Sequence, residues 1–218
     1  MQIIYLNPDN QEEIELAAEE AAKVLREGKI IIYPTDTIYG MGCDAENDQA
    51  VEKIFRIKKR EKNKPLSVIV KDIEAVNRIS FFSVKTRKVL EKFLPGPYTF
   101  ILPGARNISR LLLAGELNVG VRIPDSLVTQ KIMEKFGRPL VTTSVNISGA
   151  ESLDDPFQMA EIFSRKREAP DLLLDAGKSK NSEPSMIIDL TRSHPQILRS
   201  GNRTAREVLE LLDKLKEF

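Results

Sequence analysis

The stretch Lys29-Ile-Ile-Ile-Tyr-Pro-Thr-Asp-Thr-Ile-Tyr-Gly-Met-Gly42 decides the fold, because an unbroken apolar run ends abruptly in hydroxyl groups, one carboxylate and two glycines. Its β-branched and aromatic start, residues 30–33, predicts a strand that is buried on both faces. Pro34 ends this strand because proline cannot donate a hydrogen bond to a neighbouring strand. In α/β folds the carboxyl ends of strands hold ligands. The polar residues of the following turn are therefore candidate site residues: Thr35, Asp36, Thr37 and Tyr39.

The same turn has a second interpretation, in which it binds nothing. Short polar side chains such as that of Asp36 often bond to their own backbone in turns that are rich in hydroxyl groups. Composition alone does not separate a ligand site from such a turn, and both hypotheses stand.

The rest of the chain predicts alternating helices and strands. Helices are predicted at residues 12–27, 48–59, 72–76, 83–93, 127–136, 156–167 and 204–216, the last capped near Asn202 or Thr204, with a short helix or turn at 106–113. Strands are predicted at residues 2–6, 65–70, 98–102, 119–123, 172–177, 185–190 and 196–199, and from residue 140 onward. No linker, repeat or low-complexity segment interrupts this order, which predicts one α/β domain over residues 1–218.

The composition limits the function classes. Thirty-three basic and 32 acidic residues leave a formal net charge of +1, so no overall field favours nucleic acid. Cys43 is the only cysteine and His194 the only histidine, which excludes an intramolecular disulfide and argues against a zinc site or a Cys-His nucleophile. The apolar runs are shorter than a membrane span and the start does not resemble a signal peptide. We therefore expect a cytoplasmic protein without a membrane segment.

A basic run, Lys58-Lys-Arg-Glu-Lys-Asn-Lys64, places five cations among seven residues directly before a predicted strand. In one interpretation it is a solvated helix end whose cations complement the negative end of the helix dipole. In the other it is a clamp for polyphosphate. The second interpretation gains weight because a rigid strand holds the far side of the run.

Two more segments carry unusual polar groups. Arg122 lies inside a predicted strand, where its charge is costly unless it pairs with a carboxylate or faces a ligand. Residues 140–149 run from a short apolar strand into four hydroxyl groups and an amide. This pattern is typical either of a plain turn or of a polar site at a strand end.

Taken together, these motifs resemble the YrdC/YciO family, whose characterised members are threonylcarbamoyl-AMP synthases that act in tRNA modification. The motifs span nearly the whole chain: Tyr33-Pro-Thr-Asp-Thr-Ile-Tyr-Gly-Met-Gly42, Lys58-x-Arg60 leading into Asn63-Lys-Pro-Leu66, Leu94-Pro-Gly-Pro-Tyr-Thr-Phe-Ile-Leu102, Gly120-Val-Arg-Ile-Pro124, Ser144-x-Asn146 and Arg199-Ser-Gly201. Their combination is specific, although each alone is not. The resemblance implies a YrdC-like fold, a twisted open sheet of mixed strand direction that is flanked by helices and has a concave basic surface.

The resemblance also implies an enzyme, an L-threonylcarbamoyladenylate synthase of the nucleotidyltransferase class. The family reaction joins L-threonine, bicarbonate and ATP into threonylcarbamoyl-AMP and releases pyrophosphate. The amine of threonine becomes a carbamate, and a carbamate oxygen then displaces pyrophosphate at the α-phosphorus. Neither step needs a protein nucleophile, so the protein has only to position the reactants and neutralise charge.

Residue roles on the nucleotide side follow from the resemblance. The implied catalytic set is Lys58, Arg60, Ser144 and Asn146. Of these, Lys58 and Arg60 hold the ATP phosphates, while Ser144 and Asn146 bridge threonine and nucleotide. Further nucleotide contacts are expected at Lys62, Lys64, Asn118, Asp154 and Arg199. Mg²⁺ is expected to be held by ATP oxygens and water rather than by protein ligands.

The threonine side is expected at Thr35, Ser67, Arg122, Ser144 and Ser185. Arg122 can make a bidentate contact with the substrate carboxylate, which would account for an arginine inside a strand. The opening stretch then becomes the wall of the threonine site. Its Gly40 and Gly42 are expected to allow a tight turn and the close approach of a helix.

Some residues depart from the synthase pattern. Met186 stands where family members carry a second hydroxyl residue, and Asp36, Gly-Met-Gly-Cys43, Tyr98-Thr-Phe and Gly120 lean toward the YciO-like branch. The alternative hypothesis is therefore a YciO-like protein that binds double-stranded RNA or tRNA without synthase activity. Hydroxyl groups at strand ends favour a small-molecule pocket, and an aromatic content of only 6% does not favour RNA binding. A synthase would also have tRNA threonylcarbamoyl-transferase proteins as partners.

Overall fold

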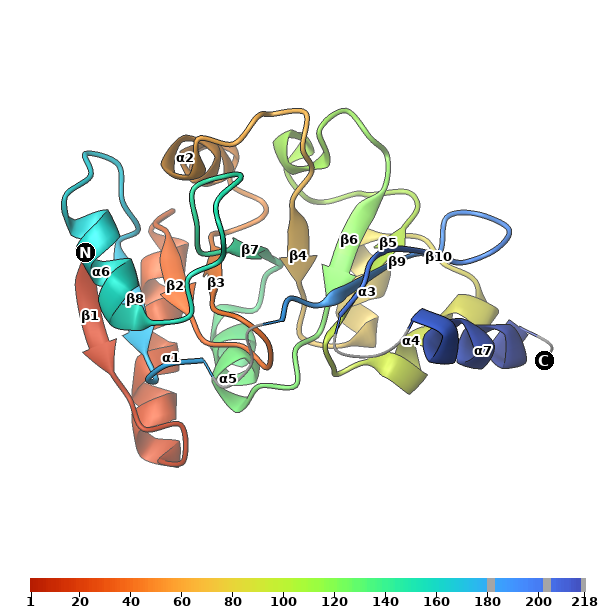
Figure 1. Ribbon diagram of the computed structural model, residues 1–218, viewed down its shortest axis with the longest axis horizontal. Helices are drawn as coiled ribbons and strands as arrows, with labels where there is room; N and C mark the ends of the chain where they lie inside the picture. The colour runs from red at the N-terminus through yellow and green to blue at the C-terminus, as the bar shows by residue number, and fades with distance from the viewer. Residues whose placement is uncertain (180–182, 202–204, 217–218) are drawn as a thin grey trace.

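The computed structural model describes residues 1–179, 183–201 and 205–216. Within them ten strands form one sheet in the order β1-β8-β2-β3-β7-β4-β6-β5-β9-β10 (Figure 1). The strands are β1 (Gln2–Tyr5), β2 (Ile31–Tyr33), β3 (Gly40–Gly42), β4 (Ser67–Ile69), β5 (Tyr98–Leu102), β6 (Val119–Arg122), β7 (Leu140–Ser144), β8 (Leu172–Asp175), β9 (Met186–Asp189) and β10 (Gln196–Arg199).

The sheet is mixed, as the resemblance implies. β8 pairs in parallel with both β1 and β2, and the pairs β4–β6 and β5–β9 are also parallel. The other five neighbouring pairs, among them β3–β7 and β4–β7, are antiparallel. β7 therefore joins the half of the sheet that contains β1, β8, β2 and β3 to the half that begins with β4.

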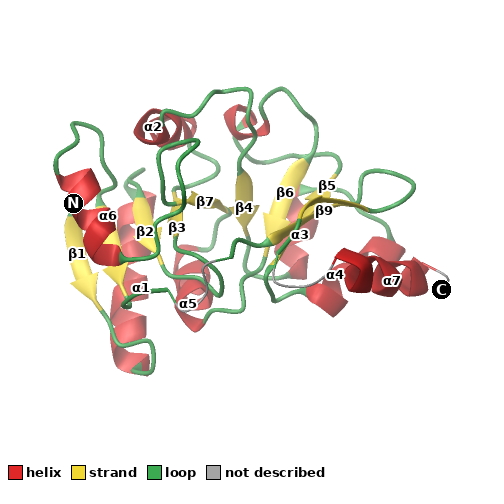
Figure 2. Cartoon of the chain, viewed as in Figure 1, coloured by secondary structure: helices red, strands yellow, loops and turns green. Residues whose placement is uncertain are grey.

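Helices flank the sheet, as Figure 2 shows. They are α1 (Gln11–Arg26), α2 (Asp48–Lys58), α3 (Ile73–Ile79), α4 (Val84–Phe93), α5 (Leu127–Phe136), α6 (Pro156–Ser164) and α7 (Ala205–Lys216), with a 3₁₀ helix η1 (Arg110–Leu113). Local signals place their ends. The side chain of Asn10, for example, caps α1 by accepting hydrogen bonds from the backbone N–H groups of Glu12 and Glu13.

The strands divide their apolar side chains between the two faces of the sheet. Ile31 of β2 and Ile69 of β4 belong to the core cluster that contains the apolar faces of α1 and α5. Their strand neighbours Ile32 and Val68 point to the opposite face, where α2, α3, α4, α6 and α7 contribute to a larger core. This period of two explains why the short apolar runs are buried on both faces.

β3 corrects the expected role of its two glycines. Gly40 and Gly42 lie inside a strand, and neither allows a tight turn or the approach of a helix. A Cβ atom at Gly42 would lie 2.2 Å from the carbonyl oxygen of Val141 in β7, and one at Gly40 would lie 2.8 Å from the ring of Tyr33. The close approach that requires glycine is therefore that of a neighbouring strand and a tyrosine ring.

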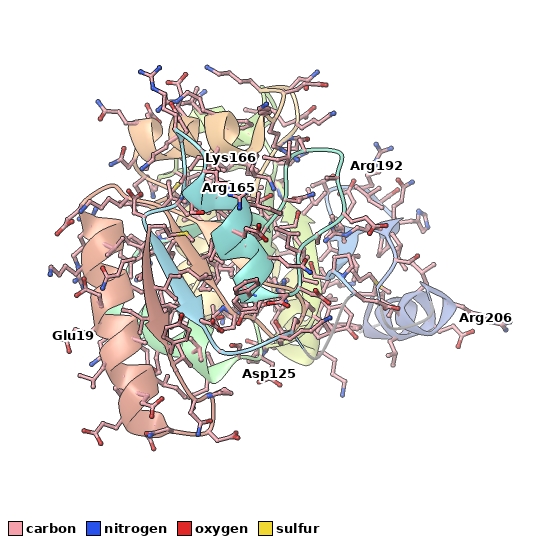
Figure 3. The ribbon with its side chains drawn as sticks, turned by 60° about the vertical axis from the view of Figure 1, so that its left-hand side comes forward. Glu19, Asp125, Arg165, Lys166, Arg192 and Arg206 are labelled. Carbon is pink, nitrogen blue, oxygen red and sulfur yellow. The ribbon has the colours of Figure 1, made fainter. Side chains whose placement is uncertain are left out.

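The remaining differences from the expected elements are small. The helix expected to end at residue 167 ends at Ser164, and the one expected to end at residue 76 continues to Ile79. The expected caps Asn202 and Thr204 lie outside the described residues. Among the described residues no helix is long and apolar enough to cross a membrane. In Figure 3 charged side chains such as Glu19 and Arg206 point outward from the ribbon. The single domain over residues 1–218 and the concave basic surface remain predictions.

The contact at Gly42 generates a stability prediction. Gly42→Ala places a methyl group against a backbone carbonyl that cannot move without separating β3 from β7, so we expect a loss of about 3 kcal/mol in unfolding free energy. The matched control is Gly137→Ala, where the left-handed backbone (φ 75°) has nothing within 4 Å of a Cβ atom. That control should cost only about 1 kcal/mol. Urea denaturation measures both, and an equal loss would contradict the steric explanation.

Candidate active site

A polar patch continues the sheet face that α1 and α5 cover. The register pairs Ser67 with Thr142 and with Gly120, and Gly40 with Ser144, so these residues share one face with Ile69. The two helices cover the apolar end of this face, whereas the hydroxyl-bearing end borders a cavity of about 180 Å³. Eight candidate residues from the sequence line this cavity: Thr35, Tyr39, Arg60, Ser67, Arg122, Ser144, Ser185 and Arg199.

Lys58 lies behind the cavity wall rather than in it. Its side chain is buried, and Nζ donates to the carbonyl oxygens of Ser144 and Asn146 (3.0 Å for the latter) and to Asn146 Oδ1 (2.7 Å). The backbone N–H of Ser148 in turn donates to the Lys58 carbonyl oxygen (2.8 Å). The helix end of α2 is thus fastened to the turn that follows β7, at residues 144–148.

Two effects act in opposite directions on the protonation of Lys58. Burial, followed by the nearby Arg60 guanidinium, lowers the pKa of Lys58 to about 7. The three oxygens around Nζ favour the ammonium form, because only an ammonium has three N–H donors.

Asn146 completes this turn. Its Oδ1 accepts hydrogen bonds from Lys58 Nζ and from Ser144 Oγ (2.7 Å), and its Nδ2 donates to the carbonyl oxygen of Ala150 (2.6 Å). Among these residues only Ser144 lines the cavity. The structure therefore places Lys58 and Asn146 where they orient Ser144 and the turn.

The residues of the basic run 58–64 lie in different environments. Arg60 lines the cavity and donates from Nε to the Lys64 carbonyl (3.1 Å) and from Nη2 to the Pro65 carbonyl (2.9 Å). Partial burial lowers the pKa of Arg60. Lys62 instead forms an exposed ion pair with Glu52 (2.7 Å), and Lys64 pairs with Glu61 (3.4 Å). Neither lysine lines the cavity, so the clamp interpretation fits Arg60 and the solvated interpretation fits Lys62 and Lys64.

Arg122 pairs with a carboxylate and also faces the cavity. Its buried side chain donates from Nη2 to Asp36 Oδ1 and to Thr37 Oγ1 (2.7 Å). Both partners belong to the turn between β2 and β3, so this contact links the turn to β6. The Asp36 carboxylate, for which one interpretation expected a bond to its own backbone, accepts a hydrogen bond from Arg122. The self-bonding side chain is that of Thr35, which donates to the Ile38 carbonyl (2.7 Å).

Ser185 and Arg199 form a second linked group. Arg199 donates from Nε (3.0 Å) and Nη2 (2.8 Å) to the Ser185 carbonyl oxygen, and the Ser185 hydroxyl lies 2.8 Å from that of Thr99. Partial burial and the nearby Arg122 lower the pKa of Arg199. Two guanidinium groups therefore approach each other at the cavity, which favours an anion between them.

Sequence reasoning missed several lining residues. Thr142 and Thr99 line the cavity from strand interiors, and Thr142 accepts a hydrogen bond from the buried Tyr33 hydroxyl (3.0 Å). The position of Thr142 two residues before Ser144 could have identified it, since residues two apart in a strand share a face. Asn118 and Asp154, which were expected near the nucleotide, do not line the cavity, and Asp154 pairs with Lys178 (3.4 Å).

The donor set of this site suits an anion better than a protein-bound metal. Among the residues that the structure describes, three arginines and no acidic residue line the cavity. The described part of the chain also holds no group of three or more His, Cys, Asp or Glu side chains that could bind a metal ion. A magnesium ion would fit here only as part of a metal–phosphate complex, since its preferred oxygen ligands would come from phosphate and water.

The fold and the cavity define a class of protein: a mixed-sheet α/β protein whose uncovered sheet face gathers guanidinium and hydroxyl groups around one cavity. The Sua5/YciO/YrdC family model, described as "Telomere recombination", matches residues 23–201. The chain belongs to this family, which confirms the resemblance seen in its motifs.

Three known proteins show what this chain is similar to in sequence and structure. A protein of Methanocaldococcus jannaschii, provisionally named threonylcarbamoyl-AMP synthase, is 38% identical over 199 residues, covering 91% of this chain and 92% of its own. Uncharacterized protein YciO of Escherichia coli K12 is 31% identical over 202 residues, covering 92% and 95%. The crystal structure of P. abyssi Sua5 complexed with L-threonine is 30% identical with a TM-score of 0.87 and covers 97% of this chain. This chain spans 61% of the length of that Sua5.

The enclosure of Lys58 predicts a pH-dependent signal. Below a pH of about 7 the Lys58 ammonium donates a hydrogen bond to each of the three oxygens. Above this pH the neutral amine has only two N–H donors, so one oxygen loses its hydrogen bond. We expect the Asn146 side-chain amide resonances to shift with a midpoint near this value in a ¹H–¹⁵N titration from pH 6 to 9. The control Lys62→Gln, an exposed lysine, should keep this transition and Lys58→Arg should abolish it. A transition that persists in Lys58→Arg would assign it to another group.

Proposed function

We propose that this protein is an L-threonylcarbamoyladenylate synthase, which forms threonylcarbamoyl-AMP and pyrophosphate from L-threonine, bicarbonate and ATP for the modification of tRNA. The observation that carries the proposal is the convergence of Arg60, Arg122 and Arg199 with strand-end hydroxyl groups on one cavity. The relative that is 38% identical and bears the synthase name over nearly the same length supports it.

The proposed reaction needs little from the protein besides placement. Bicarbonate and the threonine amine combine to a carbamate with loss of water, and a carbamate oxygen then attacks the α-phosphorus as pyrophosphate leaves. Arg60 and Arg199 neutralise the phosphates, and Arg122 holds the carboxylate of threonine. Ser144 contacts the reactants, while Lys58 and Asn146 position it through the turn at residues 144–148. Thr35, Ser67 and Ser185 complete the threonine side.

Other parts of the proposal concern the surroundings of the reaction. Mg²⁺ enters with ATP, bound to phosphate oxygens and water. The product passes to tRNA threonylcarbamoyl-transferase proteins, and the protein works in the cytoplasm. Binding of double-stranded RNA or tRNA without chemistry is the less favoured function, because the cations at the site converge on one small cavity rather than spreading over a wide face.

Pyrophosphate release tests the proposed reaction. Incubation with ATP, Mg²⁺, L-threonine and bicarbonate should release pyrophosphate, and omission of either threonine or bicarbonate should abolish the release. An enzyme-coupled phosphate assay measures this after addition of pyrophosphatase. Release that is absent with all reactants present, together with salt-sensitive binding of duplex RNA, would overturn the proposal in favour of the RNA-binding hypothesis.

The role of Arg60 can be tested by ATP binding alone. Arg60→Ala should weaken ATP binding about 10- to 100-fold, because one charge-assisted contact to phosphate contributes about 1.5–3 kcal/mol. Arg56→Ala is a matched control, since Arg56 lies on the neighbouring helix end, is exposed and pairs with Glu168 (2.9 Å). Isothermal titration calorimetry measures both variants. Equal affinities in the two would place the phosphates elsewhere.

A further inference from the structure

A second cavity lies at the opposite end of the β4–β7 pair from the candidate active site. Val70, which follows β4, and Pro139, which precedes β7, line this second cavity. Neither residue lines the first cavity, to which the same two strands contribute Ser67 and Thr142. The buried apolar pair Ile69–Leu140 lies between the two ends of the strand pair. The second cavity is therefore a separate place in the fold.

Most of the wall of the second cavity is apolar, and helices from both faces of the sheet contribute to it. Ala75 and Ile79 of α3 belong to one core cluster, and Met133 of α5 belongs to the other. The cavity has a volume of about 300 Å³. Gly137 at the end of α5 leaves part of this space open, because a Cβ atom there would have no described atom within 4 Å. Since an apolar cavity of about 150 Å³ holds benzene, the space is sufficient for a six-membered ring with a short chain.

The polar part of the wall carries more positive than negative charge. Lys71 and Arg78 are exposed, and in the described part of the chain neither side chain forms an ion pair or donates a hydrogen bond. Arg138 differs from them, because its guanidinium donates to the buried Asp44 carboxylate (3.0 Å). Among the described residues Glu46 is the one acidic residue of the wall. Lys71 and Arg78 together therefore leave a surplus of one positive charge.

The apolar wall and the charge surplus select between ligand classes. A phosphate chain would leave the apolar wall uncovered, and a neutral apolar molecule would leave both cations without a counter-charge. An apolar molecule with one carboxylate matches both parts of the wall. Its body covers the apolar side chains, and its head group lies beside Lys71 and Arg78. Ligand sites of this kind combine a mainly apolar cavity with a few polar groups that orient the ligand.

We propose that the second cavity is a binding site for a small carboxylate that carries an apolar ring. The ring lies between α3 and α5, in contact with Ala75, Ile79 and Met133, and the carboxylate lies at Lys71 and Arg78. The inference is independent of the proposed function, because it uses no residue of the candidate active site.

Binding of 3-phenylpropanoate to the full chain tests the site. Met133 is the one methionine among the described lining residues, so its methyl resonance reports on the cavity in protein labelled with ¹³C-methyl methionine. A Met133→Leu variant assigns this resonance. We expect it to shift with a dissociation constant of about 1 mM or lower, while the other methionine resonances stay in place. No shift of the Met133 resonance at about 10 mM probe, tenfold above the expected constant, would overturn the inference.

Two related probes separate the ring from the charge. 3-Phenylpropan-1-ol keeps the ring but has no charge, and it should bind at least about fivefold more weakly because it lacks the attraction to two exposed cations. Acetate keeps the charge but has no ring, and it should bind at least about 10-fold more weakly because it covers little of the apolar wall. Equal affinity for 3-phenylpropanoate and the alcohol would overturn the inference, since the cations would then select nothing.

Substitution of the two cations tests their role at positions where the fold does not depend on the charge. Lys71→Gln and Arg78→Gln should each weaken binding of 3-phenylpropanoate about two- to threefold and leave binding of the alcohol unchanged. Lys92→Gln is the control, since Lys92 is exposed on α4 and does not line the cavity. Unchanged affinity in both Lys71→Gln and Arg78→Gln would overturn the inference.

A last pair of variants locates the probe. Ala75→Leu extends an apolar side chain of α3 into the cavity and should weaken binding at least about 10-fold, because the ring loses its space. Arg60→Ala removes a cation of the first cavity and should leave binding unchanged. Loss of binding in Arg60→Ala with full binding in Ala75→Leu would place the probe in the first cavity and overturn the inference. If Ala75→Leu does not fold, the two glutamine variants still decide the outcome.

Discussion

The pairing of β7 with β4 is the constraint on which the cavity depends. It joins the two halves of the sheet and sets Ser67 opposite Thr142. A shift of one residue in this register would turn every side chain of one strand to the other face, because side chains alternate with a period of two. The apolar pairs Ile69–Leu140 and Val68–Val141 hold the register, since each is buried in a separate core. The hydroxyl groups reach the cavity as a consequence of that apolar packing.

The burial of Lys58 without a carboxylate partner indicates that this side chain holds a particular loop conformation. Lys58 is bound only by oxygens of Ser144 and Asn146 among the described residues. Burying a charge in this way costs stability relative to an apolar side chain of similar size, even when its hydrogen bonds are satisfied. This cost is accounted for if the Lys58 ammonium fixes the conformation of the turn at residues 144–148 through its hydrogen bonds. Apolar packing cannot supply that order, because carbonyl oxygens require donors.

The sequence predicts the elements well where periodicity is strong, as in α1 and α5. It fails at β3, because Gly-Met-Gly has little tendency to form a strand and pairs only where β2 and β7 supply partners. The site residues recognised from motifs gather at one cavity, but their bonding could not be predicted. Asp36 and Arg122 lie 86 residues apart, and their contact depends on how β2 and β6 meet in the sheet. Thr99 shows no local signal, since a threonine in a strand is ordinary until its neighbours are known.

Charge balance distinguishes the two functional hypotheses better than the number of cations does. Arg122 has a carboxylate partner, whereas the bonds of Arg60 and Arg199 end on uncharged oxygens, which satisfy donors without cancelling charge. Among the described residues, the three arginines therefore face the cavity with a surplus of positive charge that the other lining residues do not compensate. An RNA backbone presents one charge at a time along an extended surface. A nucleotide phosphate chain and a carboxylate concentrate several charges in a small volume, so they match this surplus of positive charge better than an RNA backbone does.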